Sequence, residues 1–241
     1  MMNYKEMKIR TINNKMDAII FLNQLIGLTE KRMTRLENAL NDVEKLMTKY
    51  KNHRKIETTI YQAYQERMDC VTMYLCNIFG DETKNAASYK QFRKIMDRKY
   101  SQGYEEFKLE PLSKDMVEIL EDLREQRNWS HHIPQSLFTS QENYMINKDG
   151  LSNEMFKRIF SNKTVYVSVW KYHDIKWLRG LYDSAKEAYD IFNTVFEQMK
   201  SDYSKLIGTD INIQKVDEPR VRPFEFVQIA EDSMKANSKR R

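Results

Sequence analysis

Residues 19–50, IIFLNQLIGLTEKRMTRLENALNDVEKLMTKY, decide the fold, because their apolar side chains recur in alternating steps of three and four. This spacing puts the apolar side chains on one stripe of an α-helix, so we predict a long first helix over about residues 15–50. Thr29 is the one polar interruption of the stripe. The stripe either packs inside its own bundle or makes a coiled-coil contact with a second subunit. Its members are Ile19, Leu22, Ile26, Met33, Leu36, Leu40, Val43, Met47 and Tyr50.

The composition favours an all-α protein. Of 241 residues only six are Gly and four are Pro, which leaves few of the tight turns that a many-stranded protein needs. A chain of this length can bury a sizeable core, so we expect an all-α helical bundle with long antiparallel helices. The longest apolar run, residues 18–28, is shorter than the ~20 residues of a membrane span, and the first residues lack a signal-peptide pattern. We therefore expect a cytoplasmic protein without membrane contact.

Charge and cysteine content restrict the function only loosely. Lys and Arg outnumber Asp and Glu by 40 to 35, which gives a net charge of +5. This excess permits an anionic partner but does not require one. Cys70 and Cys76 are six residues apart in a predicted helix with no other cysteine. We expect both to be reduced and to lie in or near the core, with no disulfide or redox role.

Helical spacing continues along most of the chain. Residues 164–170, TVYVSVW, have strand propensity, but no partner strand is predicted, so we expect an extended connector or the start of a helix there. The aromatic row of the last helix, which includes Trp177, is expected to be core. Further helices are predicted over about residues 56–79, 88–100, 153–160 and 172–207, and another begins at Pro111 and Ser113 and leads into residues 123–138. The chain then divides into an N-terminal extension (1–14), a helical domain (15–207) and a basic tail with a possible short helix (208–241).

The predicted helix at residues 88–100 has a basic face opposite its apolar face. Such a face is usually only solvated, but this is the densest basic cluster within the predicted fold. We therefore expect the first contacts with nucleic-acid phosphates here. The predicted RNA-binding residues are Lys90, Arg93, Lys94, Arg98 and Lys99, together with Arg124 of a later helix.

A second notable stretch, residues 123–138, reads LREQRNWSHHIPQSLF and combines two arginines with two adjacent histidines. At about 100° per residue, Arg127 and His131 share a helix face, as do Arg124 and His131, whereas Arg127 and His132 diverge by about 140°. Pro134 disfavours helical geometry at the residue before it, so a helix end near the histidines is expected. Arg127 and His132 can then cooperate if the helix ends between them or if two copies of the chain meet.

An arginine beside a histidine suits phosphodiester cleavage. The guanidinium is a permanent cation whose planar fork matches phosphate, and a histidine exchanges protons near neutral pH. RNA fits best because its own 2′-hydroxyl is the nucleophile, and no metal is required. A metal site at His131 and His132 is the weaker interpretation, since adjacent residues point apart on a helix. The simplest alternative is a helix end decorated with cations that stabilise the helix dipole.

The run Arg127-Asn128-Trp129-Ser130-His131-His132 resembles the R-x4-H motif of the HEPN superfamily, helical proteins of prokaryotic toxin, phage-defence and CRISPR systems. The resemblance covers about residues 15–207 and implies a homodimer in which two motifs face each other to form a metal-independent endoribonuclease without a cofactor. It implies that Arg127 holds the scissile phosphate of a single-stranded or tRNA-like RNA, that His132 is the general acid/base and that Asn128 orients them. His131 is an additional candidate for the role of His132.

The resemblance leaves the biological partner open. It implies a cognate antitoxin or another defence-system component. Where a nucleotidyltransferase antitoxin silences the HEPN toxin, a tyrosine follows two residues after the motif histidine, but Pro134 or Ile133 stands there, so that mode of control is not supported. The competing hypothesis is a non-catalytic interaction or scaffold protein that dimerises or binds a partner through the stripe of residues 19–50.

Overall fold

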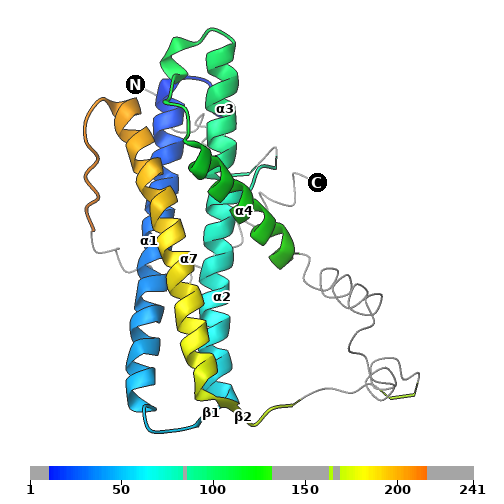
Figure 1. The fold of residues 1–241 in the computed structure, drawn as a ribbon. Helices are drawn as coiled ribbons and strands as arrows, with labels where there is room; N and C mark the ends of the chain where they lie inside the picture. Colours follow the sequence, from blue (N-terminus) through cyan, green and yellow to red (C-terminus); the bar gives the residue numbers. More distant parts are fainter. Residues whose placement is uncertain (1–10, 84–85, 132–162, 165–168, 216–241) are drawn as a thin grey trace, which may run out of the picture. The chain divides into compact units, whose positions relative to one another are not determined.

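The computed structural model describes residues 11–83, 86–131, 163–164 and 169–215, without the side chains of Ser130 and His131. The chain divides into a unit of residues 1–210 and a unit of residues 211–241. All described helices and strands belong to the first unit (Figure 1). The helices are α1 (Lys15–Lys49), α2 (Thr58–Gly80), α3 (Tyr89–Ser101), α4 (Lys114–His131) and α7 (Ile175–Ile207), with a short 3-10 turn at Glu105–Phe107 and two strands, β1 (Lys55–Glu57) and β2 (Tyr172–Asp174).

The long helices α1 and α7 pack against each other in antiparallel directions, and α2 completes the bundle beside them (Figure 1). The predicted all-α fold is therefore confirmed. Helix α1 begins where the sequence predicts, since the Asn14 side chain accepts a hydrogen bond from the Asp17 backbone N–H at 2.9 Å and caps the helix. Helix α7 ends at Gly208, whose φ of 76° is left-handed and suits glycine.

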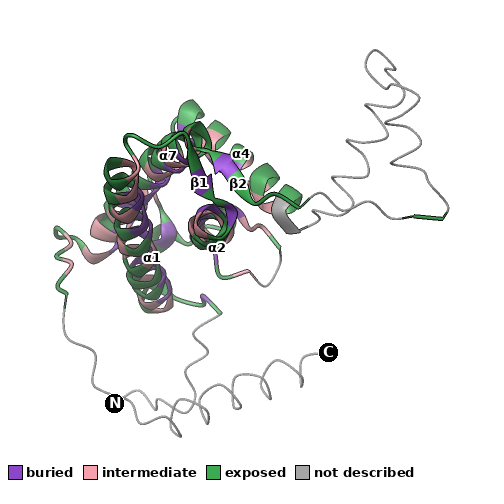
Figure 2. Cartoon of the chain, turned by 90° about the horizontal axis from the view of Figure 1, so that it is seen from below, coloured by how far each residue is buried: buried purple, intermediate pink, exposed green. Residues whose placement is uncertain are grey.

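The apolar stripe of α1 packs within the chain. Leu22, Leu36 and Val43 are completely buried, and Figure 2 shows the buried residues of the long helices on the sides that face the bundle interior. Thr29 is also buried and donates its hydroxyl to the Leu25 carbonyl at 2.8 Å, so this polar residue satisfies its hydrogen bond inside the stripe. The stripe from Leu22 to Val43 therefore packs internally, one of the two predicted arrangements, while Ile19, Met47 and Tyr50 at its ends are only partly buried.

Two short strands lie where the sequence predicted helices to begin, near residues 56 and 172. Strands β1 and β2 pair antiparallel, with Ile56 opposite His173, and this two-stranded ribbon joins the first turn of α2 to the first turn of α7. Helix α7 consequently begins at Ile175 and not at residue 172. The pairing was missed because each strand has only three residues and its partner lies more than a hundred residues away. Residues 165–168, part of the predicted connector, lie outside the described residues, as do the predicted helices at 153–160 and in the tail.

Other predicted positions differ at the ends of the bundle. Trp177 has 50% of its surface exposed and is not core. Cys76 is buried as expected, but Cys70 is exposed. None of the described helices is both long enough and apolar enough to cross a membrane.

A buried polar network ties α3 to α7. Arg93 Nη2 donates to Asp202 Oδ1 at 2.7 Å and the Tyr89 hydroxyl donates to Asp202 Oδ2 at 2.6 Å. The side chains of Arg93 and Asp202 are 5% and 3% exposed. Burial raises the pKa of Asp202, although the Arg93 charge opposes this rise, and burial also raises the pKa of Tyr89. An ion pair this deep is expensive to break, because either partner alone leaves an uncompensated charge in the core.

Candidate functional site

Helix α4 crosses α2 where α2 ends, and a glycine allows the close approach. A Cβ atom at Gly80 would lie 2.7 Å from the backbone nitrogen of Arg124 and 2.8 Å from the carbonyl carbon of Leu123. No larger residue fits without moving one helix. The crossing places the motif-bearing half of α4 against Asp81 and Glu82, which directly follow α2. This meeting place of the two helices, here called the α2–α4 junction, holds the predicted catalytic arginine.

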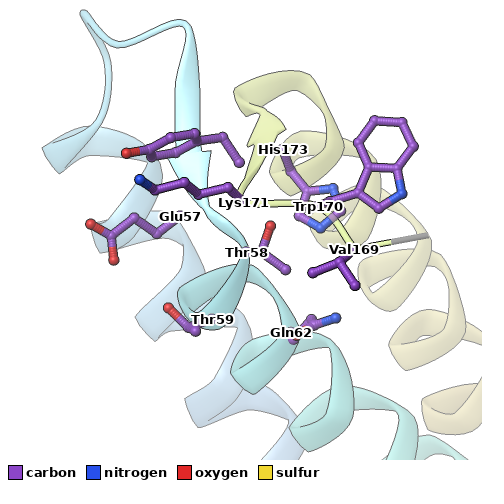
Figure 3. A pocket seen from close by; sticks show the side chains of 9 residues that line it. Glu57, Thr58, Thr59, Gln62, Val169, Trp170, Lys171 and His173 are labelled. Carbon is purple, nitrogen blue, oxygen red and sulfur yellow. The ribbon is translucent and has the colours of Figure 1, made fainter. Parts of the chain in front are cut away.

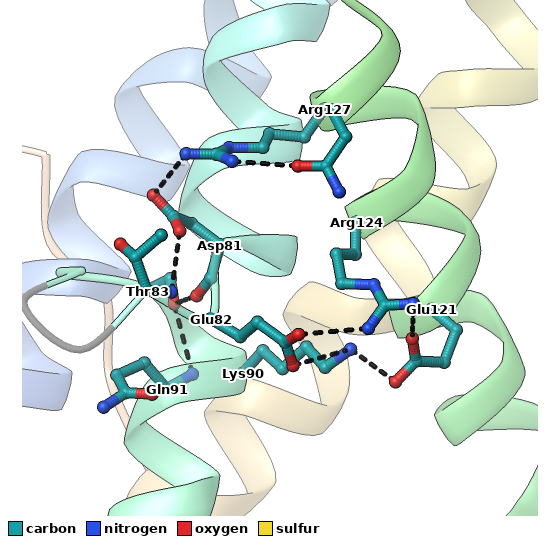
Figure 4. Close-up of polar contacts among 10 residues, drawn as sticks. Asp81, Glu82, Thr83, Lys90, Gln91, Glu121, Arg124 and Arg127 are labelled. Carbon is teal, nitrogen blue, oxygen red and sulfur yellow. Dashed lines mark hydrogen bonds and ion pairs between the residues drawn. The ribbon is translucent and has the colours of Figure 1, made fainter. Parts of the chain in front are cut away.

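Three side chains hold the Arg127 guanidinium, and Figure 4 shows its ion pair with Asp81. Its Nε donates to Asn77 Oδ1 at 3.2 Å, Nη1 to Asn128 Oδ1 at 2.9 Å, and Nη2 to Asp81 Oδ2 at 3.1 Å. The Arg127 side chain remains 21% exposed. The predicted association of Arg127 with Asn128 is therefore present. The additional carboxylate means that Arg127 is a fixed and partly neutralised cation and not one surrounded by water.

Arg124, a predicted RNA-binding residue, is paired with carboxylates. Its Nη1 lies 3.0 Å from Glu82 Oε1 and its Nη2 lies 2.9 Å from Glu121 Oε2. Lys90 of α3 contacts the same two carboxylates (Figure 4). The hydrogen bond from Arg124, aided by the charge of Lys90, lowers the pKa of Glu82, and the same hydrogen bond raises the pKa of Arg124. These two cations therefore add little net positive charge for an incoming RNA.

The basic residues predicted on α3 do not form one continuous solvent-exposed face. Arg93 belongs to the buried network with Asp202, so its assignment to an exposed RNA-binding face is wrong. Lys99 donates to the Asn13 carbonyl at 3.5 Å and lies 5.0 Å from the centre of the Phe107 ring. Lys94 and Arg98 are exposed. Only these last two of the predicted RNA-binding residues present their charge to solvent in the way that the prediction required.

The described part of the motif ends at the histidines. His131 is the last residue of α4, one helical turn after Arg127; its side chain and all of His132 lie outside the described residues. Asn128 is exposed and Trp129 has 56% of its surface exposed. The core position that the simple helix-end alternative required of Trp129 is therefore wrong. An exposed indole beside a held arginine is available for contact with a base.

Asn77 and Asp81 are the functional candidates that the sequence did not identify. They lie 50 and 46 residues before Arg127 in the chain. The available signal was the Gly80-Asp81 pair that ends α2, since a glycine in the last turn of a helix indicates either a helix end or a close helix crossing. Without knowledge of the neighbouring helix, this pair indicated only a helix end.

Comparisons with protein-family models, with curated proteins and with solved structures found no match. Among the described residues, no group of three or more His, Cys, Asp or Glu side chains is placed to hold a metal ion.

Proposed function

We propose that this protein is a metal-independent endoribonuclease of the HEPN type, whose cleavage site is formed by the motif of residues 127–132 from two copies of the chain. The observation that carries this proposal is the fixed guanidinium of Arg127. Its hydrogen bonds to Asn77, Asp81 and Asn128 restrain the planar fork at the surface, next to the turn that bears His131. A cation held in advance stabilises a developing phosphorane charge more effectively than a mobile one.

The ion pair with Asp81 is compatible with phosphate binding. At 3.1 Å it contributes one charge-assisted hydrogen bond. A phosphate oxygen that approaches the 21% exposed guanidinium offers a bond of the same kind, so the guanidinium itself loses little in the exchange, whereas the 17% exposed Asp81 carboxylate gives up its cation and repels the phosphate. Asn77 and Asn128 hold the guanidinium through neutral oxygens and do not compete for charge. In the proposed complex these two amides keep the orientation of Arg127 while the phosphate takes the place of the carboxylate.

In the proposed reaction a histidine takes the proton of the ribose 2′-hydroxyl, and the 2′-oxygen attacks phosphorus. The bond from phosphorus to the 5′-oxygen breaks, and that oxygen receives a proton from the protonated histidine of the facing copy. The products are a 2′,3′-cyclic phosphate and a 5′-hydroxyl, with atoms and charge balanced. Arg127 stabilises the equatorial oxygens in the transition state. His132 is the first candidate for the proton transfers, and His131 the second.

The test is cleavage of mixed-sequence RNA in excess EDTA by the full-length protein and by single variants. We expect Arg127→Ala and His132→Ala each to reduce cleavage by about 100-fold or more, the usual effect of removing a transition-state donor or a proton-transfer group. Arg127→Lys keeps the charge but loses the fork, so it is expected to remain impaired. An RNA with a single 2′-deoxynucleotide at the cleavage point must resist, because the nucleophile is missing.

Arg35→Ala is the matched control, because Arg35 is an exposed arginine on α1, outside the α2–α4 junction and outside the predicted RNA-binding residues. It is expected to cleave normally, and circular dichroism must show that every variant is folded. Light scattering of the unmodified protein is expected to give twice the mass of one chain. If the folded wild-type protein leaves all RNAs intact, or if Arg35→Ala is as impaired as Arg127→Ala, the proposed nuclease site is wrong.

A further inference from the structure

At the opposite end of α2 from the α2–α4 junction, a pocket of about 600 Å³ opens beside the strand ribbon (Figure 3). Helix α2 has 23 residues, so at ~1.5 Å per residue about 35 Å separates its two ends. The pocket volume lies within the ~300–1,000 Å³ typical of small-ligand sites. Here it is called the ribbon pocket. It is lined by Glu57, Thr58, Thr59, Gln62 and residues 169–173.

Two buried polar atoms of the ribbon pocket lack a hydrogen-bond partner within the part of the chain that the structure describes. They are the Thr58 hydroxyl and Nδ1 of His173. Thr58 and His173 are only 9% and 8% exposed, and they are neighbours because the Thr58 backbone N–H donates to the Lys171 carbonyl at 3.1 Å. An unsatisfied buried polar group costs about 1–3 kcal/mol. Both residues line the ribbon pocket, so a ligand there lies next to two groups whose hydrogen bonds are unmade, and it reaches these covered atoms only after a small side-chain movement.

Aromatic rings form the other recognition element. The His173 ring centre lies 4.6 Å from that of Tyr61 and 4.9 Å from that of Trp177. Trp170 lies nearly parallel to His173, with an interplanar angle of 13° and centres 6.1 Å apart. Yet Trp170 is 59% exposed, and Figure 3 shows its ring at the edge of the pocket. A large indole that is held in position by its neighbours but left uncovered offers a flat face for stacking.

We propose that the ribbon pocket binds a nucleobase, which stacks on Trp170 and forms hydrogen bonds with Thr58 and His173. A base carries donors and acceptors in the plane of its ring, so one rigid group can stack and also satisfy both buried atoms. The Thr58 hydroxyl can turn between staggered rotamers to meet it. Lys171 and Gln62 at the rim provide a cation and an amide for the attached ribose phosphate. Two other ligand classes fit less well. An acyl chain cannot form hydrogen bonds with the two polar atoms, and a sugar phosphate alone has no aromatic ring to stack on Trp170.

The base can come from a free nucleotide or from a single-stranded RNA, and binding experiments separate these sources. Equilibrium dialysis of the full-length protein would use AMP, GMP, CMP and UMP, oligoadenylate and oligouridylate, and ribose 5-phosphate as the probe without a base. We expect at least one nucleotide or oligonucleotide to bind and ribose 5-phosphate not to bind. Preference for the monophosphates identifies a nucleotide pocket, and preference for the oligonucleotides identifies an RNA-contact site.

Trp170→Leu is expected to weaken binding by roughly 5- to 100-fold, as loss of one stacking partner does. Tyr104→Leu is the control, because Tyr104 is a 54% exposed aromatic residue outside the ribbon pocket; it is expected to leave mononucleotide binding unchanged. Thr58→Val removes the hydroxyl at constant shape. It is expected to weaken binding about three- to tenfold while the melting temperature stays the same or rises, because an unsatisfied buried group has been removed.

Weaker binding together with an unchanged or higher melting temperature in Thr58→Val distinguishes a ligand-binding role from a structural one. If Thr58 and His173 only support the ribbon, Thr58→Val alters stability and leaves binding unchanged. The proposal is overturned if none of the base-containing probes binds, if ribose 5-phosphate binds as well as AMP, or if Trp170→Leu binds like the wild type. The monophosphates contain no phosphodiester that the proposed nuclease could cleave, and the oligonucleotides are tested in the Arg127→Ala background, so these outcomes do not depend on the nuclease proposal.

Discussion

Replacing Gly80 with alanine tests whether α4 is positioned by a backbone-to-backbone contact with α2. The new Cβ would lie 2.7 Å from Arg124 N, 2.8 Å from Leu123 C and 3.1 Å from Arg124 Cα. Favourable contacts between such atoms begin near ~3.5 Å, so α4 must move away by about 0.5–1 Å. Because the opposing atoms belong to the backbone, no side-chain rotation relieves the clash. Overpacking of this kind costs about 1–3 kcal/mol.

The helix propensity of alanine offsets only part of this cost. Alanine is favoured over glycine by about 1 kcal/mol in a helix interior, but Gly80 is the last residue of α2, where the gain is smaller. We therefore expect a net loss of about 1–2 kcal/mol in the free energy of unfolding. Gly27 and Gly180 are the controls, since each lies inside a helix where an added Cβ atom would meet nothing within 4 Å. Alanine there is expected to stabilise by about 0.5–1 kcal/mol.

Urea unfolding followed by circular dichroism measures all three variants, and thermal melts are expected to shift by about 2–4 °C per kcal/mol. If the α2–α4 junction carries out cleavage, Gly80→Ala should also lose up to about 100-fold in rate at temperatures where it is folded, since a ~1 Å misplacement has effects of that size. A Gly80→Ala variant that is as stabilised as Gly27→Ala would refute the close crossing, and with it the geometry assigned to Arg127.

Three further predictions concern the buried ion pair, the pH dependence of stability and the two cysteines. Asp202→Ala should destabilise the fold by about 3–5 kcal/mol, because Arg93 is left as an unpaired buried charge, while Arg93→Met combined with Asp202→Leu should recover much of that loss in urea unfolding. The lowered pKa of Glu82 adds stability that is fully present above its ordinary value of 4.5 and is lost as the pH falls through the lowered pKa; Glu82→Gln should flatten this part of the pH–stability curve. Maleimide at neutral pH should label exposed Cys70 but not Cys76, whose pKa burial raises to about 12, so intact mass should show one adduct when folded and two in urea.

The parts of the fold that the sequence predicted are those encoded in local periodicity. The apolar steps of α1 continue for about nine turns. The helix that they predicted, over about residues 15–50, agrees closely with the observed Lys15–Lys49. The ribbon of β1 and β2 could not be predicted in this way, because a three-residue strand has no measurable period and gains its stability from a distant partner. The sequence therefore predicted the long helices in the middle of the bundle but not the strand pairing at its end.

Arg93 shows how a charge pattern misleads on an amphipathic helix. The run of basic residues in α3 suggested one solvated face, but Arg93 follows Tyr89 by four residues and so lies on the same side of the helix as that buried ring. Its position relative to Tyr89 was available from the sequence. Its partner Asp202 was not, since it lies 109 residues later in another helix.

The candidate site was predictable in its residue types but not in its electrostatics. The motif supplied Arg127 and Asn128 because they are adjacent on one helix, whereas the carboxylate that meets the guanidinium comes from the end of α2. Three cations and three carboxylates meet at the α2–α4 junction, namely Lys90, Arg124 and Arg127 with Asp81, Glu82 and Glu121. Their formal charges sum to zero, so this junction exerts little long-range attraction on a polyanion. The proposed binding of RNA at this junction would therefore depend on short-range geometry, which is the property that the close crossing at Gly80 and the hydrogen bonds of Asn77 and Asn128 control.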